Sequence, residues 1–390
     1  MTPASTDRNM PWFAQAGAAC SIVPIARFVG PNIFALKRGG YGCLFSVTGI
    51  DEEGRTDEEL EARVRSLEGA LRGLPLGACL YQYTRLLSGY DIPRQPKYDN
   101  SVTEDFVNDR LTFLAQNASF RRISLHWCLT LEPPITNIFA KTPTENVNES
   151  ARRLAELQKT ANLLETHLKS SIGLKLLGKQ EAFQFFSYLF NLEEWTERAQ
   201  LRTDDGVDRQ IVRSPVSWHN DHLRVGKRYV QLFSLTNTPE ASRPCVFSSM
   251  FTLDCDSILC TTWRPQTNTE ARKEVTAQEK FTEFFKHNIF QRLLNKNNPA
   301  ELERTAGAKA ATEKVDELSE VVKSLDRKVQ GKFTLKLLLA GKSQQQLNEN
   351  VPMAHRLFVD ANAPANNSTY TRCGCGKTIM RGCRLSLRRI

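Results

Sequence analysis

The residues that could do chemistry in this sequence are few, and the most suggestive are Gly376, Lys377 and Thr378. They match the end of the phosphate-binding pattern G-x-x-x-x-G-K-[ST], in which backbone N–H groups surround the phosphates while the lysine and the hydroxyl reach the phosphates and Mg²⁺. Thr371 replaces the first glycine of the pattern, and residues 360–368 are rich in turn formers where a buried strand should stand. The sequence therefore predicts a chance match in a basic tail, with a working nucleotide site as the alternative.

A second candidate is the histidine pair His219 and His222, which has Asp221 between its members. This spacing can place two imidazoles near one face of a helix as metal ligands. A third ligand at matching spacing is absent from the sequence, and the segment stands between a turn at Pro215 and a predicted strand. We expect polar surface or interface histidines, with a metal site as the alternative.

Two further segments have suggestive residue types but no complete catalytic pattern. Asp254 and Asp256 flank a cysteine, which predicts a solvated strand end more than acid/base catalysis. Residues 121–127 (RRISLHW) interleave basic and aromatic side chains, which can stack on bases. A strand with a basic edge that discourages aggregation is favoured instead. No Gly-x-Ser-x-Gly pattern is present. We assign no catalytic, cofactor-binding or metal-binding residue.

The charge of the chain is concentrated at its C-terminal end. The net charge is +9 over 390 residues, and residues 371–390 contribute six basic residues and no acid, which leaves +3 for the rest. A nucleic-acid partner would therefore bind through this tail. The basic residues of the tail are Arg372, Lys377, Arg381, Arg384, Arg388 and Arg389.

Three of the ten cysteines, Cys373, Cys375 and Cys383, also lie in this tail. The abrupt change of composition suggests a truncated or frame-altered end. The other cysteines are scattered among apolar residues and are expected to be buried reduced thiols. These are Cys20, Cys43, Cys79, Cys128, Cys245, Cys255 and Cys260. Neither a charged-then-apolar leader nor a run of 18 apolar residues is present, so we expect a cytoplasmic protein.

The order of the strands and helices expected along the sequence predicts an α+β fold made of two consecutive α+β units. After a flexible N-terminus (1–20), an N-terminal α+β domain spans 21–135 and a central α+β domain spans 136–365. The atypical basic, cysteine-containing tail covers 366–390. In the first domain we expect a hairpin over 33–50, strands over 78–87 and 120–132, and helices that begin at capping boxes 56–59 and 101–104.

In the second domain a long connecting helix is expected from Thr142 to about Ser171, because Leu154, Leu157, Leu164 and Leu168 form one stripe. Strands are predicted over 229–235 and 257–263, and a short helix around 244–251. From about 300 to 329 the pattern is helical and charged. This segment is expected to be a helical arm near the C-terminus or a short coiled-coil contact, with one more core-facing helix as the favoured alternative.

The apolar strands and turns resemble those of a known family. Residues 211–235, continuing to Pro239 and then to 258–264, look like the central region of the conjugative-transfer and type IV secretion ATPases of the VirB/TrbE/CagE type. Residues 33–45 (IFALKRGGYGCLF) are similar to the opening strands of that family. The resemblance spans roughly residues 20–365.

This resemblance implies an assembly module of a machine that exports DNA or protein across the cell envelope. In the family, the N-terminal half docks onto inner-membrane components and neighbouring subunits, which form hexamer-type assemblies, while a C-terminal RecA-like half hydrolyses ATP with Mg²⁺. The chain stops about where that motor half should begin, so we expect no ATP, Mg²⁺ or other cofactor in this chain and carry ATPase activity onto no residue. The implied location is the cytoplasmic side of the bacterial inner membrane, with peripheral association. The alternatives are a nucleic-acid-binding protein that acts through its basic tail and a self-sufficient nucleotidase.

Overall fold

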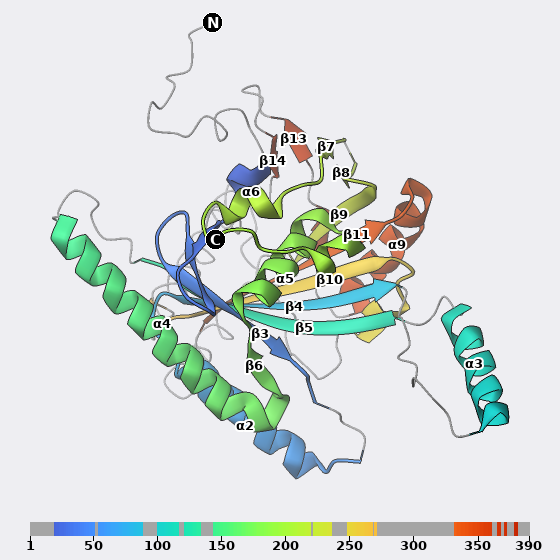
Figure 1. Ribbon diagram of the computed structural model, residues 1–390, viewed down its shortest axis with the longest axis horizontal. Coiled ribbons are helices and arrows are strands. Elements are labelled where there is room, and N and C mark those ends of the chain that lie inside the picture. The colour runs from blue at the N-terminus through green and yellow to red at the C-terminus, as the bar shows by residue number, and fades with distance from the viewer. Residues whose placement is uncertain are drawn as a thin grey trace, which may run out of the picture.

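The structure, a computed structural model, is built around one large antiparallel sheet (Figure 1). It describes residues 19–50, 54–88, 100–116, 121–133, 143–219, 221–235, 248–267, 269–270, 331–360, 365–367, 370–372 and 378–380. Neighbouring strands follow the order β1-β2-β3-β5-β4-β10-β11-β9-β8-β7, with β6 beside β3 and β12 beside β9. The strands are β1 (Ile25–Phe28), β2 (Ile33–Leu36), β3 (Tyr41–Val47), β4 (Ala78–Ser88), β5 (Arg121–Leu131), β6 (Leu174–Leu176), β7 (Val216–Trp218), β8 (Leu223–Val225), β9 (Arg228–Leu235), β10 (Asp256–Pro265), β11 (Gly331–Gly341) and β12 (Ala365–Asn367).

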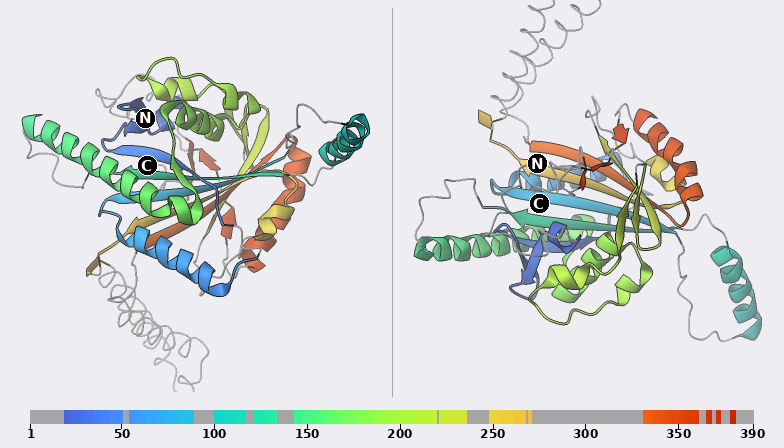
Figure 2. Two further views of the ribbon diagram at one scale, coloured as in Figure 1. Left: turned by 60° about the horizontal axis from the view of Figure 1, so that its bottom comes forward. Right: turned by 90° about the horizontal axis from the view of Figure 1, so that it is seen from above.

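Helices cover both faces of this sheet, which confirms the α+β class. On one face lie α2 and α4 at the β3–β5 half, and α9 at the β9–β11 half, while α5 and α6 cover the opposite face (Figure 2, left). The described helices are η1 (Ala19–Ile22), α2 (Asp57–Arg72), α3 (Ser101–Gln116), α4 (Pro143–Ile172), α5 (Lys179–Asn191), η2 (Glu194–Arg198), α6 (Val207–Ile211), η3 (Ser248–Thr252) and α9 (Gln344–Asp360). In this part of the chain, none of the helices has the length and apolar character needed to span a membrane.

Alternation along β4 explains why both faces are covered. Leu80 packs in the core that contains Leu157 of α4, whereas Tyr81, the next residue, packs in the core that contains Phe183 of α5. Successive side chains of a strand point to opposite faces, so an interior strand with apolar residues at both parities needs a cover on each side. Burying two apolar layers in this way supplies the main favourable term for folding.

The strands of the two predicted α+β units join in a single sheet. β4 from the first unit pairs with β10 from the second over seven residues, from Ser257 opposite Leu86 to Trp263 opposite Leu80. Beyond the last pair, Arg264 on β10 makes a two-bond ion pair with Glu132, at 2.9 and 3.2 Å. Residues far apart in sequence therefore lie side by side at the centre of the molecule.

Most of the predicted elements are present. The hairpin over 33–50 is β2 and β3, and its turn places Gly39 and Gly40 at φ +82° and +87°, where residues with a side chain are strained. The strands predicted over 78–87, 120–132, 229–235 and 257–263 are β4, β5, β9 and β10, and the long helix from Thr142 is α4. The short helix predicted around 244–251 corresponds in part to η3. The helical segment 300–329 lies outside the described residues.

One of the two predicted helix caps is confirmed and the other differs from the prediction. The side chain of Thr56 accepts a hydrogen bond from the backbone of Glu59, so α2 begins as the capping box predicts. The helix α3 does not begin at a Ser101 cap, because the carboxamide oxygen of Asn100 accepts the bond from Val102 N at 2.9 Å. Asparagine is an equally good cap and stands one residue earlier, which moves the start of the helix.

Candidate functional site

The helix α3 has the most conspicuous exposed apolar surface of the described residues. Figure 1 draws this helix away from the sheet, and its side chains of Val102, Phe106 and Phe113 are 72%, 67% and 69% exposed. Steps of four and seven residues bring them to one face of a helix. We call these three residues the α3 stripe. Exposed large apolar side chains on one face are typical of a contact surface for another protein.

The rest of α3 limits what this surface can bind. Asp105 and Asp109 lie beside the α3 stripe on the helix and are exposed. Val107, Leu111 and Leu114, on another face, are half-buried. The helix therefore presents an apolar stripe with acidic neighbours, which suits an apolar partner groove bordered by basic residues.

The histidine pair is in a turn between two short strands and not on a helix. His219 N donates to His222 O at 3.0 Å, which closes the turn between β7 and β8. The two rings stack with centroids 4.5 Å apart, and Nδ1 of His222 lies 2.8 Å from the Asp221 carboxylate. Of the two histidines predicted to be polar surface or interface residues, His219 is exposed and His222 is buried, so the prediction is wrong for His222. Within the described ranges, no group of three or more His, Cys, Asp or Glu side chains is placed to hold a metal ion.

The two aspartates at the start of β10 have separate partners. Asp254 is exposed and binds Arg121 at 2.8 Å. Asp256 is buried and lies 3.2 Å from the guanidinium of Arg228. The prediction of a solvated strand end is therefore right for Asp254 and wrong for Asp256. Because each carboxylate faces its own arginine, the two do not form an acid/base pair.

The basic segment 121–127 is wrongly predicted as a sheet edge, because β5 lies between β3 and β4 in the interior of the sheet. Its arginines contact acids from other elements: Arg121 binds Asp254, and Arg122 donates to both carboxylate oxygens of Glu197 on η2. These acids come from segments more than 70 residues away, which single-strand patterning does not reveal. The segment therefore crosslinks the fold.

The basic tail is only partly described. Gly376 and Lys377 lie outside the described residues, whereas Thr378 begins strand β14 (Thr378–Met380). This strand pairs with β13 (Tyr370–Arg372), with Thr378 opposite Arg372. In a phosphate-binding loop the threonine would stand at the start of a helix. The hairpin thus agrees with a chance match.

The cysteines outside the tail match the prediction of buried thiols where they are described. Cys43, Cys79, Cys128 and Cys255 are buried, and Cys20 and Cys260 are partly buried. Burial raises the pKa of Cys255 to about 12 and raises the pKa of Cys128 well above its ordinary value, so these thiols are unreactive at neutral pH. Cys245 and the tail cysteines Cys373, Cys375 and Cys383 lie outside the described residues.

One polar group that the sequence reasoning missed is Arg85, which lies on the α5 side of β4 and is only 8% exposed. No motif marks it. The available signal is its place in the strand, because Cys79, Tyr81, Tyr83 and Leu87 share its parity and form an otherwise apolar or aromatic face. A charged residue at such a position is unusual unless it is paired.

Comparison of the sequence with protein-family models gives no match, and comparison with curated proteins gives none. The function proposed below therefore depends on the residues and on their geometry.

Proposed function

We propose that this chain is the N-terminal docking and assembly part of a type IV secretion, or conjugal transfer, ATPase. It would bind other subunits of the machine at the cytoplasmic side of the bacterial inner membrane. Hydrolysis of ATP with Mg²⁺, which energises export of DNA or protein, would be the task of the motor half of such an ATPase. In such a machine the chain would also contact copies of itself.

The residues that carry the family resemblance support the proposal by their placement. Segments 33–45 and 211–235 and the strand residues 258–264 fall on β2, β3, β7, β8, β9 and β10, which belong to one sheet. A resemblance spread over sequence-distant segments is more informative when those segments form one structural unit. The sheet, with helices packed on both of its faces, is a scaffold from which a docking element can project.

The observation that carries the docking function is the α3 stripe. Three large apolar side chains that each keep about 70% of their surface exposed gain free energy when a partner covers them. Asp105 and Asp109 beside the stripe favour a partner with a basic border. We therefore assign α3 as the surface that binds an inner-membrane subunit of the apparatus.

The test is co-purification of the tagged chain with the inner-membrane subunits from cells that carry the secretion apparatus. The double variant Phe106→Ala, Phe113→Ala should lose at least tenfold of the recovered subunits, because exposed aromatic anchors dominate such contacts. The matched control is Phe251→Ala on η3, a phenylalanine that is also exposed. Equal recovery with all three proteins would contradict docking through α3.

Two further measurements separate this proposal from the alternative functions. Removal of residues 371–390 should leave the co-purification unchanged, whereas loss of DNA retention in that deletion would favour nucleic-acid binding through the tail. A rise in mant-ATP fluorescence with the wild type but not with Lys377→Ala would instead identify a nucleotidase.

A further inference from the structure

A polar cleft lies between the sheet and α5, on the face opposite α4. Its volume is about 330 Å³. Its lining residues come from β3, β4, β5, β6, α5 and η2, and they include Ser46, Arg85, His126, Lys175, Phe185 and Glu197. Strand register explains the convergence, since Ser46 stands opposite His126, and Ser124, two residues before His126, stands opposite Arg85.

Arg85 is the buried charge of this cleft. Its Nε donates to Ser124 Oγ at 2.8 Å, and its guanidinium carbon lies 5.2 and 5.0 Å from the ring centroids of Phe185 and Tyr188. The two terminal nitrogens donate to no acceptor among the residues that the structure describes. Aromatic faces attract a guanidinium but do not replace hydrogen-bond acceptors.

The two carboxylates that line the cleft are already engaged with other groups. Glu197 accepts both terminal nitrogens of Arg122, and Glu181 accepts the backbone N–H of Gly178 at 2.9 Å and lies 3.9 Å from Lys175. With these two acids matched by Arg122 and Lys175, the guanidinium of Arg85 is left as an excess of one positive charge. Buried charges are normally paired, because an unpaired one loses its solvation without compensation.

The neighbouring histidine does not offset this charge. His126 packs against Phe185, with ring centroids 4.5 Å apart, and its buried Nδ1 has no hydrogen-bond partner in the described part of the chain. Burial, helped by the charge of Arg85, lowers the pKa of His126 to about 3, so the ring is neutral at physiological pH. Burial also lowers the pKa of Arg85 itself. Both effects describe a pocket that disfavours positive charge until an anion enters.

We propose that this cleft binds a carboxylate group, which accepts hydrogen bonds from the two terminal nitrogens of Arg85. The guanidinium that donates these bonds is the one that lies near the rings of Phe185 and Tyr188. A planar carboxylate matches the guanidinium with two parallel bonds. A phosphate dianion fits less well, because its second charge would meet Glu181 and Glu197, and the other cations described around the cleft, Lys175 and Arg122, already face these two acids. The volume is at the low end for ligand pockets, which favours a small carboxylic acid or the free C-terminal end of a peptide. This site does not depend on docking through α3.

The experiment is a thermal-unfolding titration of the full chain with sodium propionate at constant ionic strength. We expect a saturable rise in the melting temperature with propionate, none with propionamide, and a weaker effect with phosphate. Arg85→Met should reduce the affinity for propionate by about tenfold or more, since a charged hydrogen-bond donor pair is lost. Arg85→Lys keeps the charge but not the two-bond geometry, and it should show an intermediate affinity.

The matched control is Arg121→Met, since Arg121 is an arginine on neighbouring β5 whose side chain is 8% exposed and already has the carboxylate of Asp254. This variant should lose stability and keep the propionate response, whereas Arg85→Met should fold with little loss because no acid is left unpaired. No saturable effect on the wild type, an unchanged affinity in Arg85→Met, or tighter binding of phosphate would overturn the proposal.

A short peptide with a free C-terminus, compared with the same peptide as its amide, distinguishes the two sources of the carboxylate. A free peptide that binds at least tenfold more tightly than propionate and its own amide identifies a chain end as the ligand. Equal affinity of the free peptide and propionate identifies a small carboxylic acid. If both peptide forms bind equally well, the carboxylate is not what the cleft recognises and the proposal fails.

Discussion

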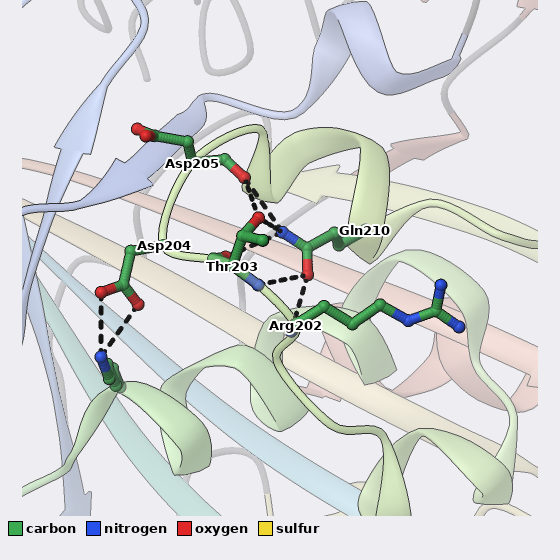
Figure 3. A network of polar contacts seen from close by, with 6 residues as sticks. Arg202, Thr203, Asp204, Asp205 and Gln210 are labelled. Carbon is green, nitrogen blue, oxygen red and sulfur yellow. Dashed lines mark hydrogen bonds and ion pairs between the residues drawn. The ribbon is translucent and has the colours of Figure 1, made fainter.

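Two polar regions packed against α5 differ in how completely their hydrogen bonds are made. At the N-terminal end of α5, Gln210 ties the loop before α6 together (Figure 3). Its carboxamide oxygen accepts from Arg202 N at 2.9 Å and Thr203 N at 3.4 Å, and its nitrogen donates to Thr203 O and Asp205 O at 2.9 and 3.0 Å. Every atom of this carboxamide is used.

In the cleft near the middle of α5 the opposite holds. Arg85 uses one of its three nitrogens, and Nδ1 of His126 and Nε of Arg122 are buried without a hydrogen-bond partner in the described residues. A completed network stabilises one conformation, whereas polar groups left open cost stability and are retained where a ligand completes them. The contrast separates a structural polar region from a candidate binding region on the same helix.

The largest expected effect lies at a second completed polar site, Asn191 at the C-terminal end of α5. This fully buried residue donates to the carbonyls of Ser187 and Ile211, each at 2.7 Å, and accepts from the backbone of Arg213 at 3.0 Å and Ser214 at 2.8 Å. Asn191→Ala removes the side-chain partner of four backbone groups, the carbonyls of Ser187 and Ile211 and the N–H groups of Arg213 and Ser214. We expect a loss of about 3 kcal/mol in the free energy of unfolding, measured by urea denaturation.

The control for this variant is Asn162→Ala on α4, since Asn162 is exposed. A surface asparagine-to-alanine change within a helix should alter the free energy of unfolding by less than about 0.5 kcal/mol. If both variants unfold at the same urea concentration, the site at Asn191 does not contribute the stability that its hydrogen bonds indicate.

The second effect concerns His126 in the cleft, and it depends on pH. The pKa of His126 is lowered to about 3 in the folded state, mainly by burial, against about 6.5 for a free histidine. As the pH falls below about 6.5, His126 takes up a proton in the unfolded chain before it does so in the folded chain. The contribution of His126 to stability is therefore fully present above about pH 6.5 and is lost progressively toward pH 3. At pH 5 the loss from this residue is about 2 kcal/mol relative to pH 7.5.

His126→Gln removes this titration and keeps a polar side chain. The difference in urea midpoint between pH 7.5 and pH 5 should therefore shrink in the variant. Other groups titrate over the same pH range in both proteins. Comparing the change in urea midpoint of the wild type with that of the variant therefore isolates the contribution of His126. Identical pH dependences would show that the imidazole is not held neutral in the cleft.

A smaller effect is expected at Gln210 in the completed region. Gln210→Ala removes the side chain that closes the loop from Arg202 to Asp205, but the loop is solvent-exposed and water can replace part of the bonding. We expect a loss of about 1 kcal/mol in the urea experiment. Gln345→Ala on α9 is the control, since this exposed glutamine donates to Glu349 one turn along the same helix, and it should change stability by a few tenths of a kcal/mol.

Sequence patterning predicted the strands β3, β4 and β5 on the sheet side of the cleft, but not β6, α5, η2 or α6, and not the two regions themselves. Alternation predicted β4 and β5, and the leucine stripe predicted α4, because each pattern reports burial along one segment. The helix α9 and the strand β11 were missed, although α9 has buried residues Leu347, Ala354, Leu357 and Phe358 at helical spacing. Pro352 within α9 disguised the helix, since proline usually ends one.

The cleft could not be predicted, because its residues meet only through the pairing of non-neighbouring segments. Arg85, His126 and Phe185 are separated by 40 residues or more, and nothing local to any of them specifies the partner strand. The same limit explains the errors at Asp256 and at the supposed basic edge, since Arg228 and Glu197 come from other elements. The α3 stripe was equally hidden, because helical spacing does not say which apolar face is left exposed.

The smallest expected effect on stability concerns the ion pair between Glu197 and Arg122 at the rim of the cleft. Glu197 and Arg122 are paired on the rim with side chains 40% and 38% exposed, so breaking the pair by Glu197→Gln should change the free energy of unfolding by less than about 1 kcal/mol. The substitution removes a negative charge and adds to the positive excess around Arg85, so propionate should bind about threefold more tightly at low salt. Glu61→Gln, which breaks an exposed pair with Arg65 on α2, should leave propionate binding unchanged. Weaker propionate binding in Glu197→Gln would mean that Glu197 helps to hold the ligand, and the free charge of Arg85 would then not be what selects it.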